Sequence, residues 1–81
     1  MENDKEIIIN ERINITKDIC PMTFVKTKLK LESMNSGEIL EVTLREGEPL
    51  KNVPKSVNEE GHNIISLFKC DEYYRLIIKK K

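Results

Sequence analysis

The spacing of apolar and polar residues changes along the chain, and each change marks an expected element. Ile13 and Ile15 alternate with polar neighbours, which predicts a short strand that stops just before Cys20. From Pro21 the spacing becomes helical and continues to a helix stop at residues 35–37. The residues at helical spacing are Phe24, Thr27, Leu31 and Met34. The pattern therefore opens with a strand and a helix.

The remaining chain repeats this change of period and then ends in two strands. Residues 39–44 alternate like a second strand, and residues 50–60 carry a weaker helical pattern. Pro54 interrupts that pattern, and because an interior proline removes a helical hydrogen bond, we expect a short turn followed by a helix. Two further strand-like runs, residues 63–68 and 73–78, are joined by a polar link and should form a hairpin.

The element order is therefore βαβαββ, and 81 residues leave room for one domain. Right-handed crossovers would make the first three strands parallel, with the last strand antiparallel to the third. We expect an α/β (α+β) two-layer sandwich, with two helices on one face of a mixed four-stranded sheet. Residues 1–12, which include the run Ile7-Ile8-Ile9, are interpreted as an N-terminal extension, either an edge strand or an arm, and residues 13–81 as the domain.

Composition narrows the classes of function. Fourteen basic and fourteen acidic residues cancel, which removes the broad positive field that nucleic-acid binders use. No apolar run approaches the length of a membrane span, and the first residues lack the pattern of a signal peptide. We therefore expect a cytoplasmic protein, in whose reducing environment Cys20 and Cys70 would be free thiols.

Cys20 carries the clearest chemical signal. Pro21 is favoured at the first position of a helix, which places Cys20 at the N-cap, facing free backbone N–H groups and the positive end of the helix dipole. Both favour the nucleophilic thiolate and therefore lower the pKa of the thiol. Lys17 and Lys26 would add to this effect if they lie close, and Asp18 would oppose it.

A plainer interpretation is that Cys20 is a small buried apolar residue, as most free cysteines are. The strand-to-helix junction set by Pro21 and the absence of a zinc-type Cys-x-x-Cys pair favour a reactive thiol instead.

Nearly the whole chain past residue 12 resembles the TusA-like (SirA-like) family of sulfurtransferases. The matching stretches are Cys20-Pro21-Met22-Thr23-Phe24-Val25, Gly37-Glu38, Val53-Pro54 and Gly61-His62. The mark of the family is a Cys-Pro-x-Pro motif, in which Thr23 here replaces the second proline, as in a branch of the family with threonine or asparagine at that place. Ile13 and Lys17 replace the usual upstream acidic residue and glycine.

The resemblance implies a sulfur carrier that accepts a sulfane sulfur as a persulfide on Cys20 and relays it. The donor would be a cysteine desulfurase or another donor protein, and a downstream protein would be the acceptor. Cys20 would be the only catalytic residue, with Pro21, Met22 and Thr23 shaping the site and no cofactor or metal. We expect a monomer that binds neither membrane nor nucleic acid directly. The alternative is a non-catalytic interaction or regulatory module of the same fold, which Thr23 and the altered upstream residues favour.

A second apolar strip on the first helix begins beside Cys20. Met22, Val25 and Leu29 fall at helical spacing away from the core strip, and we expect them to dock a donor or acceptor protein. The alternative is that the arm around residues 7–9 covers them. Lys26, on a polar side of the helix, either steers an acidic partner or simply faces solvent.

Two further residues have less certain roles. His62 follows a helix end, where a histidine often caps carbonyl groups, so we expect a structural role rather than a general base. Cys70 lies in the predicted hairpin, which we expect at the same edge of the sheet as Cys20, and it is a possible second thiol that resolves a persulfide. A disulfide needs Cα atoms within about 7 Å, and the two cysteines fall on different strands, which makes this the lesser alternative.

Overall fold

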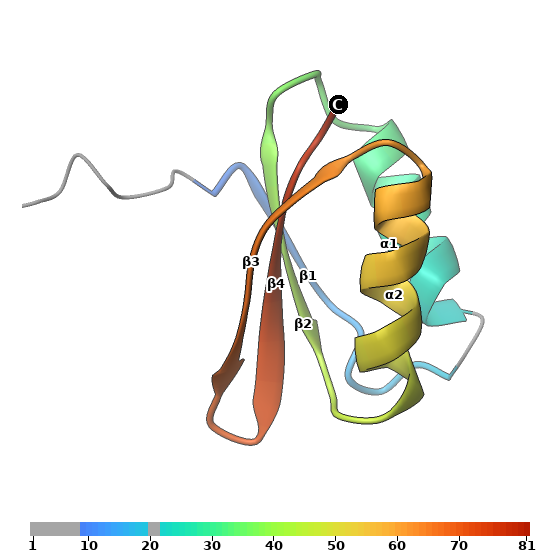
Figure 1. Cartoon of the computed structure of the whole chain (residues 1–81), viewed down its shortest axis with the longest axis vertical. Helices are drawn as coiled ribbons and strands as arrows, with labels where there is room; N and C mark the ends of the chain where they lie inside the picture. The colour runs from blue at the N-terminus through green and yellow to red at the C-terminus, as the bar shows by residue number, and fades with distance from the viewer. Residues whose placement is uncertain (1–8, 20–21) are drawn as a thin grey trace, which may run out of the picture.

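A computed structural model of the chain describes residues 9–19 and 22–81. Its elements are β1 (Glu11–Asn14), α1 (Met22–Glu32), β2 (Ile39–Leu44), α2 (Glu48–Glu59), β3 (Asn63–Cys70) and β4 (Tyr73–Lys79). Both helices cover one face of a single four-stranded sheet (Figure 1). The predicted βαβαββ order and the two-layer sandwich are confirmed.

The strand order in the sheet is β1-β2-β4-β3. β1 and β2 are parallel, whereas β4 runs antiparallel to both of its neighbours, so the first three strands share one direction as predicted. The last strand is inserted between β2 and β3 and becomes a central strand. β1 and β3 are therefore the two edges of the sheet, separated by two strands.

The core lies between the sheet and the helices. Alternate residues of β2 and β4 share the helix-covered face, as in the register pair Val42–Leu76. The fully buried residues of the strands are Leu40, Val42, Leu44, Leu76 and Ile78, and those of the rest of the core are Ile15, Leu31, Val53 and Val57. Each such side chain contributes about 1.5–3 kcal/mol by leaving water.

The helix α2 differs from the sequence prediction. It runs without interruption from Glu48 to Glu59 with Pro54 inside it, so the expectation of a turn before the helix was wrong. An interior proline costs about 3 kcal/mol. Val53 and Val57, one turn apart and buried against the sheet, contribute a comparable amount and hold the helix together. The helix starts favourably, because Pro49 lies in its first turn.

The described part of the helix α1 begins at Met22, and the predicted roles of Cys20 as N-cap and Pro21 as first helical residue fall outside the described residues. Its buried residues are Thr23, Thr27 and Leu31, whereas Phe24, expected in the core, is only partly buried. The hydroxyl of Thr27 donates a hydrogen bond of 2.9 Å to the carbonyl oxygen of Thr23, which satisfies a fully buried polar group. Neither of the two described helices has the length and apolar character needed to cross a membrane.

Candidate functional site

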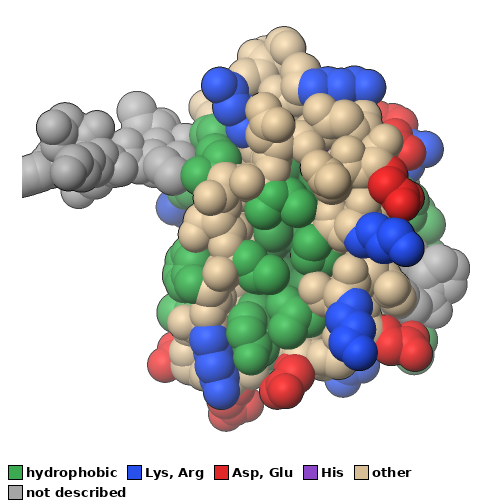
Figure 2. Space-filling model, viewed as in Figure 1, with side chains coloured by type: hydrophobic (Ala, Val, Ile, Leu, Met, Phe, Trp, Pro, Cys, Tyr) green, Lys and Arg blue, Asp and Glu red, His purple; other side chains and the backbone are tan. Residues whose placement is uncertain are grey.

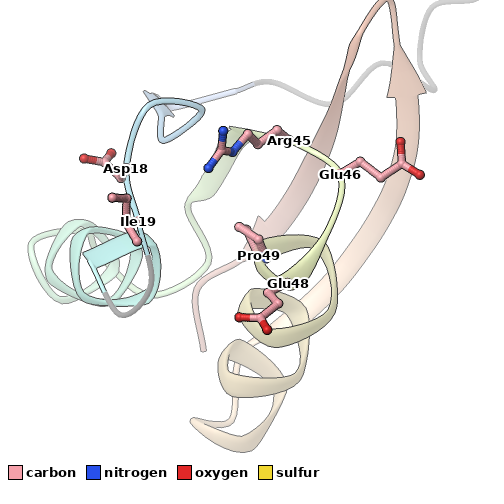
Figure 3. A pocket seen from close by; sticks show the side chains of 6 residues that line it. All are labelled: Asp18, Ile19, Arg45, Glu46, Glu48 and Pro49. Carbon is pink, nitrogen blue, oxygen red and sulfur yellow. The ribbon is translucent and has the colours of Figure 1, made fainter.

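The loops that follow β1 and β2 meet at one end of the sheet. The strands are parallel neighbours with Asn14 in register with Thr43, so their carboxyl ends lie together. Between these loops lies an open cavity of about 370 Å³ (Figure 3). It is lined by Asp18, Ile19, Arg45, Glu46, Glu48 and Pro49. The cavity therefore joins the segment before Cys20 to the start of α2.

Arg45 is the cationic residue that lines this cavity, alongside the carboxylates of Asp18, Glu46 and Glu48. Its side chain extends from the end of β2 toward Asp18 and Ile19, whereas Glu46 points away from them (Figure 3). Among the described residues, no carboxylate forms an ion pair with Arg45. A free guanidinium thus faces the chain segment that leads into Cys20.

Cys20 and Pro21 themselves lie outside the described residues, but their two neighbours in the chain are placed. Ile19 is 73% exposed, and its carbonyl oxygen accepts a 2.7 Å hydrogen bond from the backbone N–H of Met22. The first turn of α1, which starts at Met22, contains no acidic side chain. The positive end of the helix dipole therefore follows directly after the Cys-Pro pair, and no carboxylate within that first turn neutralises it.

An ion pair fixes the acidic residue nearest to Cys20 in the sequence. Lys26 Nζ lies 2.8 Å from Asp18 Oδ1. The negative charge of Asp18, which could oppose formation of a thiolate two residues away, is thus compensated by Lys26. From the sequence, Lys26 was expected either to steer an acidic partner or to face solvent. In the structure its side chain is half exposed and is paired with Asp18.

The predicted apolar strip of α1 is largely accessible. Met22 is 47% exposed and Leu29 60% exposed, while Val25 is partly buried. A shallow hollow of about 520 Å³ adjoins Leu29 at the edge of the sheet. Its lining residues are Ile13, Asn14, Ile15, Lys26, Leu29, Lys30 and Ser33. The arm at residues 7–9, which was the alternative cover for this strip, falls mostly outside the described residues.

Two of the remaining predicted residues lie apart from the cavity between the loops. Thr23 is fully buried in the first turn of α1 and supports the helix from inside. Cys70 is a partly buried free thiol at the end of β3, the sheet edge opposite β1. Across β2 and β4, this placement corresponds to three strand spacings of about 4.8 Å each. The expectation that Cys70 shares a sheet edge with the segment leading to Cys20 was therefore wrong, and its role in resolving a persulfide stays a prediction.

His62 is buried but does not cap a helix carbonyl through its ring. Its Nδ1 atom accepts a 3.2 Å hydrogen bond from the backbone N–H of Lys81, so the ring anchors the C-terminal end of the chain. Burial lowers the pKa of His62 from its ordinary value of 6.5, and the positive charges of Lys80 and Lys81 lower it further, against the opposing effect of Glu60. This histidine is a structural residue and lies outside the lining of the cavity between the loops.

Sequence reasoning did not single out Ile19, Arg45 or the start of α2. The signal for Ile19 was an apolar residue within a polar loop directly before the cysteine. The signal for Arg45 was indirect, because only the parallel pairing of β1 and β2 brings the ends of these strands together.

Comparisons with known proteins identify the family of this chain. The family model for sulfurtransferase TusA matches residues 11–80. A protein of Archaeoglobus fulgidus named "Putative sulfur carrier protein" is 45% identical over 78 residues, which cover 95% of this chain and 89% of the relative. A relative of similar name from Methanocaldococcus jannaschii is 32% identical and covers 91% of this chain and 99% of its own length. The chain belongs to the TusA family of sulfurtransferases.

A solved structure supports the same fold. The crystal structure of a SirA-like protein from Desulfitobacterium hafniense superposes with a TM-score of 0.74 at 18% sequence identity. The match covers 85% of this chain and 95% of the other. The predicted family and its fold are therefore confirmed.

Proposed function

We propose that the protein is a cytoplasmic sulfur carrier whose Cys20 receives and passes on a sulfane sulfur. The thiolate of Cys20 attacks the terminal sulfur of a persulfide on a donor protein, such as a cysteine desulfurase. A new S–S bond forms on Cys20, and the S–S bond of the donor breaks, with the donor cysteine leaving as a thiolate. An acceptor protein then takes the same sulfur from Cys20 by an equivalent attack, which restores the Cys20 thiolate.

The observation that carries this proposal is the match to the TusA family over residues 11–80, which includes the Cys-Pro pair at the start of α1. The helix end supports the chemistry, because its N–H groups and dipole favour an anionic sulfur. The Arg45 side chain extends toward the segment that ends in Cys20, in a cavity that Glu46 and Glu48 also line. Thr23, although it replaces the second proline of the family motif, is compatible with this arrangement because it is buried inside the helix turn.

A carrier must also present its sulfur to proteins. Ile19 and Met22 flank the Cys-Pro pair in the chain and are both exposed, and Leu29 extends the apolar surface along α1. We define these three residues, with the partly buried Val25, as the docking strip. Lys26 lies beside this strip, and its ion pair with Asp18 leaves its side chain half exposed. The strip fits an apolar patch on a donor or acceptor protein placed next to the cysteine.

Intact-protein mass spectrometry after incubation with a cysteine desulfurase and cysteine tests the carrier function. The wild type should gain the mass of one sulfur atom, and the gain should disappear after reduction with dithiothreitol. Cys20→Ser should gain none, whereas Cys70→Ser should load like the wild type.

The outcomes separate the alternatives. If Cys20→Ser loads and Cys70→Ser does not, the sulfur is carried by Cys70 and not by Cys20. An unloaded wild type, together with ordinary reactivity of Cys20 toward alkylating reagents, would favour the non-catalytic interaction module of the same fold. In both cases circular dichroism of each variant establishes that the substitution leaves the fold intact.

A further inference from the structure

The two residues that follow β4 are bound to the loop between α1 and β2, beside which the C terminus lies (Figure 1). The Gly37 N–H donates a 2.9 Å hydrogen bond to the carbonyl oxygen of Lys80, and the Lys80 N–H donates one of 2.9 Å to the carbonyl oxygen of Glu38. Ser36 Oγ donates a 2.6 Å hydrogen bond to the main-chain oxygen of Lys81. These bonds attach the segment after β4 to the segment before β2.

His62, in the turn after α2, also binds Lys81. The histidine is 7% exposed, and its Nδ1 atom accepts a 3.2 Å hydrogen bond from the Lys81 N–H. Because Nδ1 accepts a hydrogen bond only while it carries no proton, this geometry assigns the neutral ring with its proton on Nε2. The Lys81 side chain covers Gly61, where a Cβ atom would lie 3.1 Å from Lys81 Cδ. Lys81 is thus held through its N–H, its main-chain oxygen and its side chain.

The charges around the His62 ring favour its neutral form. Lys80 and Lys81 act on the ring from the segment after β4, and Glu60 acts on it from the C-cap of α2. Burial and the two lysines lower the pKa of His62, against the opposing effect of Glu60. On the facing loop, the Glu38 carboxylate accepts a hydrogen bond within its own loop. Figure 2 shows lysine or arginine side chains at the end of the molecule where the C terminus lies. A proton on the ring therefore meets two ammonium groups against one carboxylate.

We propose that the contact between His62 and Lys81 is a pH-sensitive latch, which releases Lys81 from the turn at residues 61–62 when Nδ1 takes up a proton from solvent. The protonated ring presents an N–H group to the Lys81 N–H, so two donors face each other and the hydrogen bond is lost. The positive ring also repels both ammonium groups and favours contact with water. The hydrogen bonds of Lys80 do not involve the ring, so the release is confined to Lys81 and the turn.

The latch lies at the start of β2, the end of the sheet opposite the loops that follow β1 and β2. The inference does not depend on the proposed sulfur-carrier function. Release removes the ring from its buried position and from the lysines, which returns the pKa of His62 toward its ordinary 6.5. The closed latch is therefore favoured above pH 6.5, and release becomes more favourable as the pH falls toward the lowered pKa. For one proton, the equilibrium constant for release rises by at most about tenfold per pH unit.

Two-dimensional NMR of the full chain between pH 7.5 and pH 5 tests the proposal. The ring nitrogen shifts of His62 report the proton, and the heteronuclear NOE of the Lys81 amide reports release. This NOE should fall with the same midpoint as the ring titration, whereas the NOE of the Lys80 amide should stay constant. His62→Asn keeps an acceptor atom but binds no proton, so its Lys81 amide should not respond to pH. A Lys81 NOE that stays constant while the ring titrates, a ring that stays neutral to pH 5, or the same pH response in His62→Asn would overturn the proposal.

A second variant tests the latch while the ring stays in place. Ser36→Ala removes the hydrogen bond to the Lys81 oxygen and should make release about twofold or more easier at any given pH. By linkage, the midpoints of the ring titration and of the Lys81 NOE should both move to higher pH. Ser33→Ala is the matched control, because Ser33 Oγ donates a 2.7 Å hydrogen bond to the Lys30 carbonyl oxygen at the end of α1. It should leave both midpoints unchanged. Unchanged midpoints in Ser36→Ala would contradict the latch, and circular dichroism checks that each variant is folded.

Discussion

Lys26 Nζ and Asp18 Oδ1 lie 2.8 Å apart and connect the segment before Cys20 to the second turn of α1. The carboxylate is the more enclosed partner, with 19% of the Asp18 side chain exposed against 50% for Lys26. The pair spans the Cys-Pro junction and compensates the acidic charge nearest to Cys20 in the sequence. Its main effect should therefore be on the thiol, because exposed ion pairs contribute only about 0.2–1 kcal/mol to stability.

Lys26→Gln should slow alkylation of Cys20 by iodoacetamide at pH 7 by about two- to fivefold. The uncompensated Asp18 carboxylate disfavours a second anion, so the midpoint of the pH–rate profile should move to higher pH. Asp18→Asn should leave the rate unchanged or raise it. These rates are measured by mass spectrometry in a Cys70→Ser background, so that only one thiol reacts.

Lys30→Gln provides the matched control for this prediction. Lys30 also forms an ion pair on α1, with its Nζ 2.9 Å from Glu11 Oε1, but that pair lies farther along the helix from Cys20. Lys30→Gln should therefore leave the alkylation rate of Cys20 unchanged. Equal slowing by both variants would show that the effect comes from the helix charge in general and not from the pair with Asp18.

The fold was predictable from local patterns because each change of hydrophobic period coincides with one element. The Cys20–Pro21 pair predicts a helix start by a local preference of proline, and the described part of α1 begins at the next residue, Met22. Pro54 was misjudged because its local cost is offset by the burial of Val53 and Val57, which depends on the packed sheet. Local patterns are therefore least reliable where tertiary packing opposes them.

The candidate site was predictable only in part, for a similar reason. The cysteine and the apolar strip follow from sequence spacing alone. The closeness of Arg45 to the segment at Ile19 depends on which strands pair, and spacing along the chain does not encode it. Thr23 was interpreted as a residue that shapes the site, but its complete burial makes it a core residue as well. The sequence did not indicate this burial, because the threonine side chain is polar.

The stability of the protein should fall as the pH drops through and below about 6.5 because of His62. Its pKa is lower in the folded chain than the ordinary 6.5, mainly because of burial, so the unfolded state binds a proton first as the pH falls. The stabilisation by the neutral ring is therefore complete above 6.5 and is lost as the pH falls toward the lowered pKa. One proton gives a slope of at most about 1.4 kcal/mol per pH unit.

Urea unfolding between pH 8 and pH 5 measures this slope. His62→Asn keeps an acceptor atom for the Lys81 N–H but cannot bind a proton, so it should flatten the pH dependence between pH 7 and pH 5.5. Asp and Glu side chains contribute mainly below this window. An identical slope in the wild type and in His62→Asn would show that another group titrates.

Leu29→Lys should weaken sulfur transfer without changing the thiol. Leu29 is 60% exposed on the docking strip, and a charge there opposes contact with an apolar patch on the desulfurase. The concentration of carrier that half-saturates loading should rise about tenfold, whereas the alkylation rate of Cys20 stays at the wild-type value. Leu67→Lys, an equivalent change at a 43% exposed leucine on the far edge of the sheet, should load normally. If Leu29→Lys loads as well as the wild type, the donor binds elsewhere on the protein. If the alkylation of Cys20 is slowed in this variant, the substitution acts on the cysteine and not on docking.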